Sequence, residues 1–164
     1  MNLELSDMEI ASHIKENLSE TWLPVIYRDK IRTLRTRAYR LDVEARENKT
    51  EIQHTLLGVE LKVRNKRLSC PDLSTARYLQ VFARLGCREI AVPYDITKIS
   101  HLADELESSW QRTLLLFEEE TRGKTPQLKG KLRSALIREI RGELDEIGAG
   151  ALMPEFRQST KQRQ

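Results

Sequence analysis

The residues from 57 to 69 constrain the fold of this chain more than any other segment, because apolar and charged side chains alternate along them. Such alternation is the period of a β-strand with one buried face. The apolar positions are Val59, Leu61 and Val63. A turn-forming run at 64–66 separates this strand from a short returning strand, so the segment predicts a β-hairpin. Glu60 and Lys62 would then lie together on its outward face.

The spacing of apolar residues predicts helices on both sides of the hairpin. A first helix begins at a capping box opened by Ser6. Another begins after Asp72, and Gly86 stands where a glycine commonly ends a helix. A short strand over 89–94 follows this helix directly. Two long amphipathic helices then predict a helical hairpin over 97–147.

These elements predict an α/β fold, with an α+β fold as the alternative. A strand, a helix and a second strand in succession are typical of a parallel pair joined by a crossover helix. We therefore expect a small mixed sheet that contains the hairpin and one parallel pair, flanked by helices and followed by the long C-terminal helical hairpin. The 164 residues have the length of one domain, expected over 1–157, and the polar tail at 158–164 is expected to be disordered.

Residues 38–56 fit two templates, and periodicity does not choose between them. Their apolar residues recur at helical spacing, yet several also alternate with charged neighbours. In the strand interpretation, a helix through the preceding basic residues gives way to a strand near 38–45. A second strand then runs from about Glu51 into the Glu60 segment, with a bulge or bend at Gly58.

Positive charge is concentrated between residues 28 and 40, where six basic residues accompany a single acidic one. The net charge of +3 does not by itself indicate a nucleic-acid partner, so this distribution matters more. On a helix, Arg28, Arg32 and Arg35 would align in a row suited to phosphate contacts. Arg32 and Arg35 are therefore the candidate nucleic-acid contacts. A solvated helix surface accounts for the same pattern.

Cysteine usage and hydropathy predict a soluble, cytoplasmic protein. Cys70 and Cys87 lack the spacing of metal ligands, so we expect small buried residues in a reducing compartment. No apolar run follows a basic amino terminus, which argues against a signal peptide. The longest apolar run, at 114–117, is too short to cross a bilayer, and no membrane contact is expected.

Asp42 and Glu60 are the candidate metal ligands. In the strand interpretation Asp42 lies on the strand before the Glu60 strand, so the two carboxylates can meet at one end of the sheet. Two hard oxygen ligands and phosphate oxygens suit Mg²⁺, which keeps part of its water shell. The metal would activate a water while Lys62 stabilises developing charge. A solvated strand face would also carry Glu60 and Lys62, and a helical 38–56 would remove Asp42 from the site.

The segment 38–95 resembles the core of the PD-(D/E)XK nuclease superfamily. The resemblance rests on Asp42, on Glu60-Leu61-Lys62, and on a returning strand, a helix and another strand in the family's order. It implies a metal-dependent nuclease in which Asp42 and Glu60 bind the metal and Glu60 and Lys62 are catalytic.

Two functions of different classes follow. The first is a Mg²⁺-dependent phosphodiesterase that acts on DNA or RNA. The alternative is a non-enzymatic interaction module that binds protein or nucleic acid through its long helices, in which the C-terminal helices can also form a homodimer.

Overall fold

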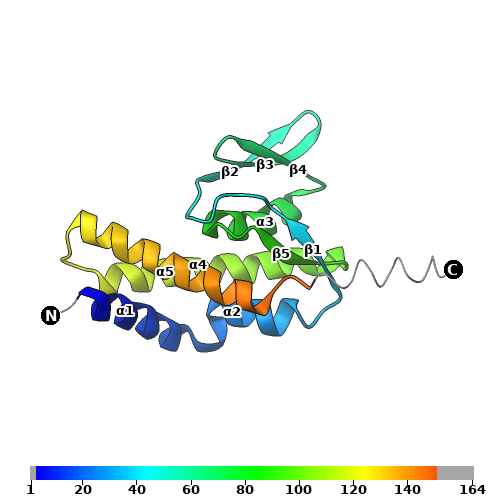
Figure 1. Ribbon diagram of the computed structural model, residues 1–164. Coiled ribbons are helices and arrows are strands. Elements are labelled where there is room, and N and C mark those ends of the chain that lie inside the picture. The colour runs from blue at the N-terminus through cyan, green and yellow to red at the C-terminus, as the bar shows by residue number, and fades with distance from the viewer. Residues whose placement is uncertain (1–2, 151–164) are drawn as a thin grey trace.

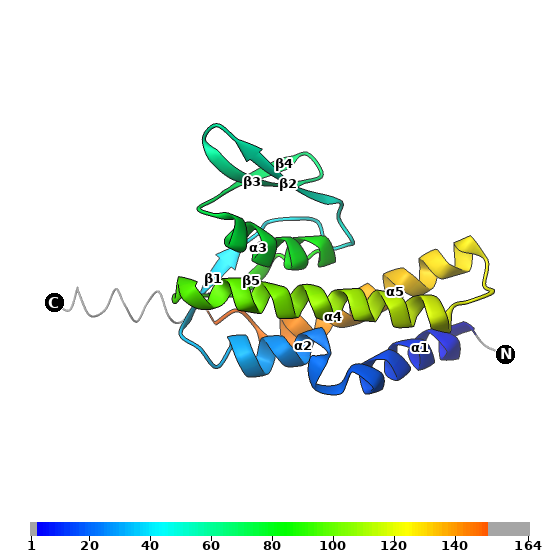
Figure 2. The ribbon, with the colours of Figure 1, turned by 180° about the vertical axis from the view of Figure 1, so that it is seen from behind.

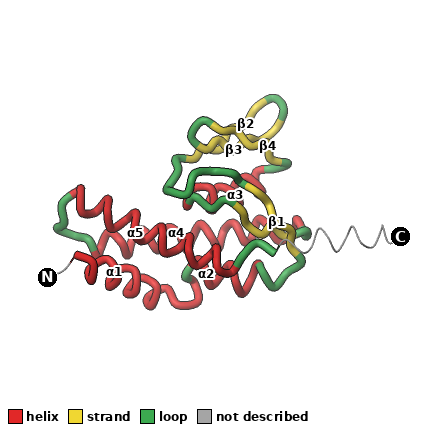
Figure 3. The backbone as a smooth tube through the Cα atoms, in the orientation of Figure 1, coloured by secondary structure: helices red, strands yellow, loops and turns green. Residues whose placement is uncertain are grey.

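The protein folds into a layer of helices that carries two small antiparallel sheets (Figure 1, Figure 3). The computed structural model describes residues 3–150. Its α-helices are α1 (Leu3–Leu18), α2 (Leu23–Ile26), α3 (Leu73–Leu85), α4 (Ile99–Glu120) and α5 (Pro126–Ile147). Short helical turns are η1 (Ser19–Thr21), η2 (Tyr27–Ile31) and η3 (Ile96–Lys98). The strands are β1 (Thr36–Arg40), β2 (Thr50–Thr55), β3 (Gly58–Val63), β4 (Lys66–Cys70) and β5 (Glu89–Pro93).

The mixed α/β class predicted from the sequence is confirmed, as are the two long helices predicted over 97–147. The predicted end of the domain at residue 157 and the tail at 158–164 lie outside the described residues.

The two sheets have no strand in common. β1 pairs antiparallel with β5, which places Thr36 opposite Pro93, and β2, β3 and β4 form an antiparallel meander in that order. The predicted parallel pair is therefore wrong. The crossover rule applies to strands of one sheet, whereas α3 connects β4 of the meander to β5 of the other sheet.

The β2–β3–β4 meander packs one face on α3 and turns the other face away from it (Figure 1, Figure 2). Leu61 and Val63 of β3 are buried in the core, while Glu60 and Lys62 project from the opposite face. The hairpin predicted from 57–69 is thus confirmed as β3 and β4, with the predicted buried face.

Residues 38–56 form neither the continuous helix nor the pair of strands that the sequence pattern allowed. β1 ends at Arg40, so the strand predicted near 38–45 occupies only the first part of that range. The helix predicted through the basic residues ends already at Ile31, in the turn η2. The predicted second strand does not run unbroken into β3, because the chain turns back at 56–57. Gly58 follows that turn with a φ of +130°, which favours glycine.

Local sequence signals place α3 correctly. Asp72 is its N-cap, and its Oδ1 accepts a hydrogen bond from the backbone N–H of Thr75 at 2.8 Å. Gly86 ends the helix in the left-handed region, with φ of +84°. α1 differs from expectation, because it begins at Leu3 and so contains Ser6, which the sequence pattern places at its N-cap.

The helices enclose an aromatic core. α4 packs against α1 and α3, while α5 contacts α1, α2 and α3. The largest side chains that this packing removes from solvent are Trp22, Tyr27, Tyr78, Phe82 and Phe117. The Tyr27 hydroxyl donates to the carbonyl of Gly148 and accepts from the backbone N–H of Ala91, both at 2.9 Å. It therefore ties the end of α5 to β5.

Both cysteines are free and buried, as predicted. The deep burial of Cys87 and of Tyr27 makes the free energy of unfolding fall at alkaline pH. Burial raises the pKa of Cys87 to about 12 and that of Tyr27 to about 12. In the unfolded chain a thiol releases its proton near pH ~8.5 and a phenol near pH ~10. Above about pH 9 the unfolded state therefore binds fewer protons than the folded state, and the free energy of unfolding falls as pH rises towards ~12.

We expect Cys87→Ala to flatten the first part of this fall, between about pH 9 and 10, where the thiols titrate before the phenols in the unfolded chain. Urea denaturation at a series of pH values measures the slope. Cys70→Ala is the matched comparison. It should flatten the slope less, because Cys70 is less deeply buried than Cys87 and burial is what raises the pKa of both thiols. An unchanged slope in Cys87→Ala would show that this thiol is not the group involved.

Candidate nucleic-acid interface

Asp42 lies in the loop after β1 and not on a strand, so its predicted position beside Glu60 is wrong. It is exposed and has a left-handed φ of +57°. Its Oδ2 is 3.5 Å from Nζ of Lys66, which also donates to the carbonyls of Leu41 and Asp42. The strand interpretation fails here because β1 ends at Arg40, before the chain reaches the carboxylate.

Glu60 occupies its predicted place on the outward face of β3, but its carboxylate is already paired. Its Oε1 accepts a hydrogen bond from Nη1 of Arg67 at 3.2 Å, across the β3–β4 pairing. Lys66 and Arg67 are consecutive in β4, so their side chains point to opposite faces of the meander. The partner of Asp42 and the partner of Glu60 thus lie on different faces.

The two carboxylates are therefore not brought together as a pair of Mg²⁺ ligands. Among residues 3–150, no group of three or more histidine, cysteine, aspartate or glutamate side chains is placed to hold a metal ion. The predicted metal roles of Asp42 and Glu60, and a catalytic role for Glu60 with Lys62, gain no support from this geometry.

Arg32 and Arg35 do not form the predicted helical row, because η2 ends at Ile31 and Arg35 lies just before β1. Arg32 is half-buried, and its Nη1 donates to Oγ1 of Thr36 at 3.1 Å. Arg35 is exposed and stacks on Tyr94, with its guanidinium carbon 5.1 Å from the ring centroid. Arg32 thus serves the fold, whereas Arg35 remains accessible.

Three basic residues line a surface hollow of about 340 Å³ at one end of the meander, which we call the basic hollow. Its lining residues are Lys49, Thr50, Glu51, Lys62 and Arg64. The antiparallel register places Thr50 opposite Val63 and Glu51 opposite Lys62. The backbone N–H of Arg64 donates to the carbonyl of Lys49 at 3.0 Å, which closes this end of the sheet.

The cations of the basic hollow differ from their neighbours in having no carboxylate partner. Arg46, Lys66 and Arg67 each lie within 4 Å of an acidic side chain. No such ion pair occurs for Lys49, Lys62 or Arg64 within the part of the chain that the structure describes. With Glu51 as its one acidic residue, the lining carries more positive than negative charge.

The loop that presents Lys49 is fixed to α3 by Asn48, which is almost fully buried. Its backbone N–H donates to the carbonyl of Arg84 at 2.9 Å, and its Nδ2 donates to the carbonyl of Ala83 at 3.1 Å. Lys49 therefore starts from a defined backbone position, although its own side chain is exposed. A fixed backbone lowers the entropy cost of holding an anion there.

Sequence reasoning finds Lys62 but misses Lys49 and Arg64, because both lie in turns at the ends of strands. The signal that would have found them is the register of the β2–β3 hairpin, which brings residues 49 and 64 together. That register depends on the turn at 56–57, which the pattern of apolar residues does not predict.

Comparisons with family models, with curated proteins and with solved structures find no match for this chain. The resemblance to the nuclease superfamily therefore stays a prediction. What the fold itself defines is a mixed α/β protein in which a three-stranded meander stands on a helical layer. Over residues 3–150, no helix combines the length and apolar character needed to span a membrane.

Proposed function

We propose that this protein is a non-enzymatic module that binds the phosphate backbone of nucleic acid at the basic hollow. The observation that carries the proposal is that Lys49, Lys62 and Arg64 line one hollow and that none of them has a carboxylate partner among residues 3–150. Cations that are not neutralised by the protein are available to phosphates, and the release of counterions from the nucleic acid favours their binding.

Lys62 takes a different role in this proposal from the one implied by the nuclease resemblance. Glu51 lies opposite it in the sheet, but Lys62 also shares the basic hollow with Lys49 and Arg64, which suits contact with successive phosphates along a strand. The Glu60 carboxylate forms an ion pair with Arg67, and the Asp42 carboxylate forms one with Lys66 on the other face of the meander. The geometry therefore supports binding more than metal-dependent hydrolysis.

The surfaces of α4 and α5 are less suited to binding a partner than the surface of the meander is. The apolar side chains of α4 and α5 are mostly directed into the core. Leu115 is the one large apolar side chain of these two helices that is strongly exposed. A stable dimer commonly needs a contiguous apolar patch, so we place the binding surface on the meander and leave the helix-mediated homodimer as the less supported proposal.

Fluorescence anisotropy with a labelled single-stranded DNA, at low salt, tests the proposal and separates it from hydrolysis. We expect binding in EDTA as well as in Mg²⁺, and no cleavage in either. Lys62→Gln should weaken binding several-fold, because it removes one phosphate contact. Glu60→Gln should leave binding unchanged or strengthen it, because it removes a negative charge and releases Arg67.

The opposite pattern would overturn the proposal. Cleavage that requires Mg²⁺ and disappears in Glu60→Gln would establish the phosphodiesterase instead. Binding that is equally strong in wild type and Lys62→Gln would place the contact elsewhere on the surface.

A further inference from the structure

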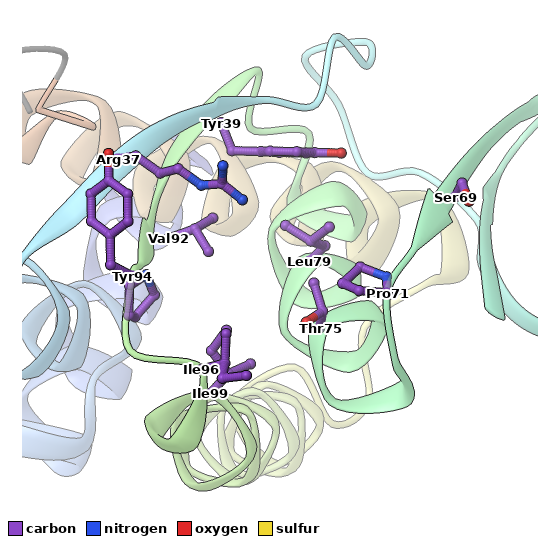
Figure 4. Close-up of a pocket in the computed structure, with 11 residues that line it drawn as sticks. Arg37, Tyr39, Ser69, Pro71, Thr75, Leu79, Val92, Tyr94, Ile96 and Ile99 are labelled. Carbon is purple, nitrogen blue, oxygen red and sulfur yellow. The ribbon is translucent and has the colours of Figure 1, made fainter. Parts of the chain in front are cut away.

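A second hollow lies between the two sheets and is independent of the basic hollow. It is a cavity of about 280 Å³, bounded by β1 and β5, by the end of β4, by the first turns of α3 and by the start of α4 (Figure 4). Its volume is close to the lower end of the ~300–1,000 Å³ that is common for sites of small molecules. The cavity therefore has room for a small ligand only.

The floor of this cavity is apolar. Leu79 from α3, Val92 from β5 and Ile99 from α4 line it, and all three are packed into the core. Pro71 closes the side next to β4. Such a surface favours the burial of an aromatic or branched hydrocarbon group.

The mouth of the cavity is cationic. Arg37 is the one charged residue of the lining, and no acidic side chain contributes to it. In Figure 4 its guanidinium projects from β1 toward the cavity, between Tyr39 and Tyr94. No carboxylate or hydrogen-bond partner of the Arg37 side chain occurs among residues 3–150.

Two acidic residues, Asp72 and Asp95, are adjacent in sequence to residues that line the cavity, and both accept local hydrogen bonds. Asp72 accepts the N–H of Thr75 as the N-cap of α3. Asp95 accepts the N–H of Thr97 at 3.0 Å and its hydroxyl at 2.6 Å. Both carboxylates have local hydrogen bonds, and neither lies within 4 Å of the Arg37 guanidinium.

We propose that this cavity binds a small aromatic anion, with the ring on the apolar floor and the anionic group against the Arg37 guanidinium. A guanidinium can donate two parallel hydrogen bonds to a carboxylate or to a phosphate monoester, which are the two sources of this ligand chemistry. Thr75 lines the same cavity, and a threonine hydroxyl is a further hydrogen-bond donor. Because Arg37 is the one charged residue of the lining, the cavity favours an anion over a neutral or cationic ring.

NMR titration of the full chain with phenylacetate, phenyl phosphate and neutral phenylacetamide tests this inference. We expect saturable shifts of amides around the cavity with either anion, in about the millimolar range, and weaker binding of the amide. The preferred anion distinguishes a carboxylate source from a phosphate source. Arg37→Gln should weaken binding of the preferred anion about tenfold, since it removes a charge-assisted hydrogen bond. Arg37→Lys should keep part of the affinity.

Arg40→Gln is the matched control, because Arg40 lies on the same strand but on its other face and does not line the cavity. It should bind as the wild type does. Arg37 is exposed, so its variants should keep the dispersed amide spectrum of the folded protein. Equal affinity for acid and amide, wild-type affinity in Arg37→Gln, or shifts that do not saturate would each overturn the inference. None of these outcomes bears on DNA binding at the basic hollow, which involves other residues.

Discussion

Gly86→Ala is expected to destabilise the protein by about 3–5 kcal/mol, which is large for the addition of one methyl group. Gly86 ends α3 with φ of +84°, where a side chain is strained. A Cβ at this position would lie 2.4 Å from both the backbone N and the carbonyl O of Arg46, and 2.8 Å from the carbonyl O of Glu44. These are backbone atoms, so relief requires the 41–49 loop to move away from α3.

Gly123→Ala is the matched control for this prediction. Gly123 has nearly the same φ, +86°, but an added Cβ would meet nothing within 4 Å. It should therefore cost only the conformational strain, about 1–2 kcal/mol. Urea denaturation of both variants measures the difference. Equal losses would show that the close approach of the loop to Gly86 contributes nothing beyond strain.

The second large effect is a loss of DNA affinity, expected when the three positive charges of the basic hollow are removed. The combined variant Lys49→Gln, Lys62→Gln, Arg64→Gln should bind single-stranded DNA at least about tenfold more weakly at 50 mM salt. In the wild type, three phosphate contacts predict a slope of about −2 for the logarithm of affinity against the logarithm of salt concentration. In the combined variant the slope should approach zero. Anisotropy titrations over a range of salt concentrations measure both quantities.

A charge-matched control separates a local contact from the overall charge. Arg122, Lys131 and Arg138 are exposed cations near or on α5, and none of them is within 4 Å of a carboxylate in the described part of the chain. Replacing these three by glutamine removes the same number of positive charges from the net of +3. This control should keep the wild-type affinity and slope. If both combined variants lose affinity alike, binding is diffuse and the basic hollow is not the site.

The parts of the fold that depend on neighbouring residues are predictable from the sequence. The β3–β4 hairpin follows from alternation with a period of two, and α3 follows from its Asp72 cap and its terminal Gly86. The pairing of β1 with β5 is not predictable in this way, because the strands are separated by the meander and α3. Their apolar patterns do not specify which strand each will join.

In the candidate site, too, features set by neighbouring residues are predictable and features set by the pairing of distant segments are not. Glu60 and Lys62 share the outward face of β3, as alternation predicts. The end of β1 at Arg40 decides the position of Asp42, and no local signal marks that end. The pairing of Glu60 with Arg67 is also not predictable from the sequence, because the register of β3 and β4 brings Arg67 close to Glu60. Lys49 and Arg64 meet for the same reason.

The measurement that tests the central proposal most directly is an NMR titration of the isotope-labelled protein with a short oligothymidylate in EDTA. If the basic hollow binds phosphate, the largest amide shifts will fall at Lys49, Lys62, Arg64 and their strand neighbours, and they will disappear at high salt. If the largest shifts fall instead along α4 and α5, or arise around Asp42 and Glu60 only when Mg²⁺ is added, the proposal that the meander binds the nucleic-acid backbone is contradicted.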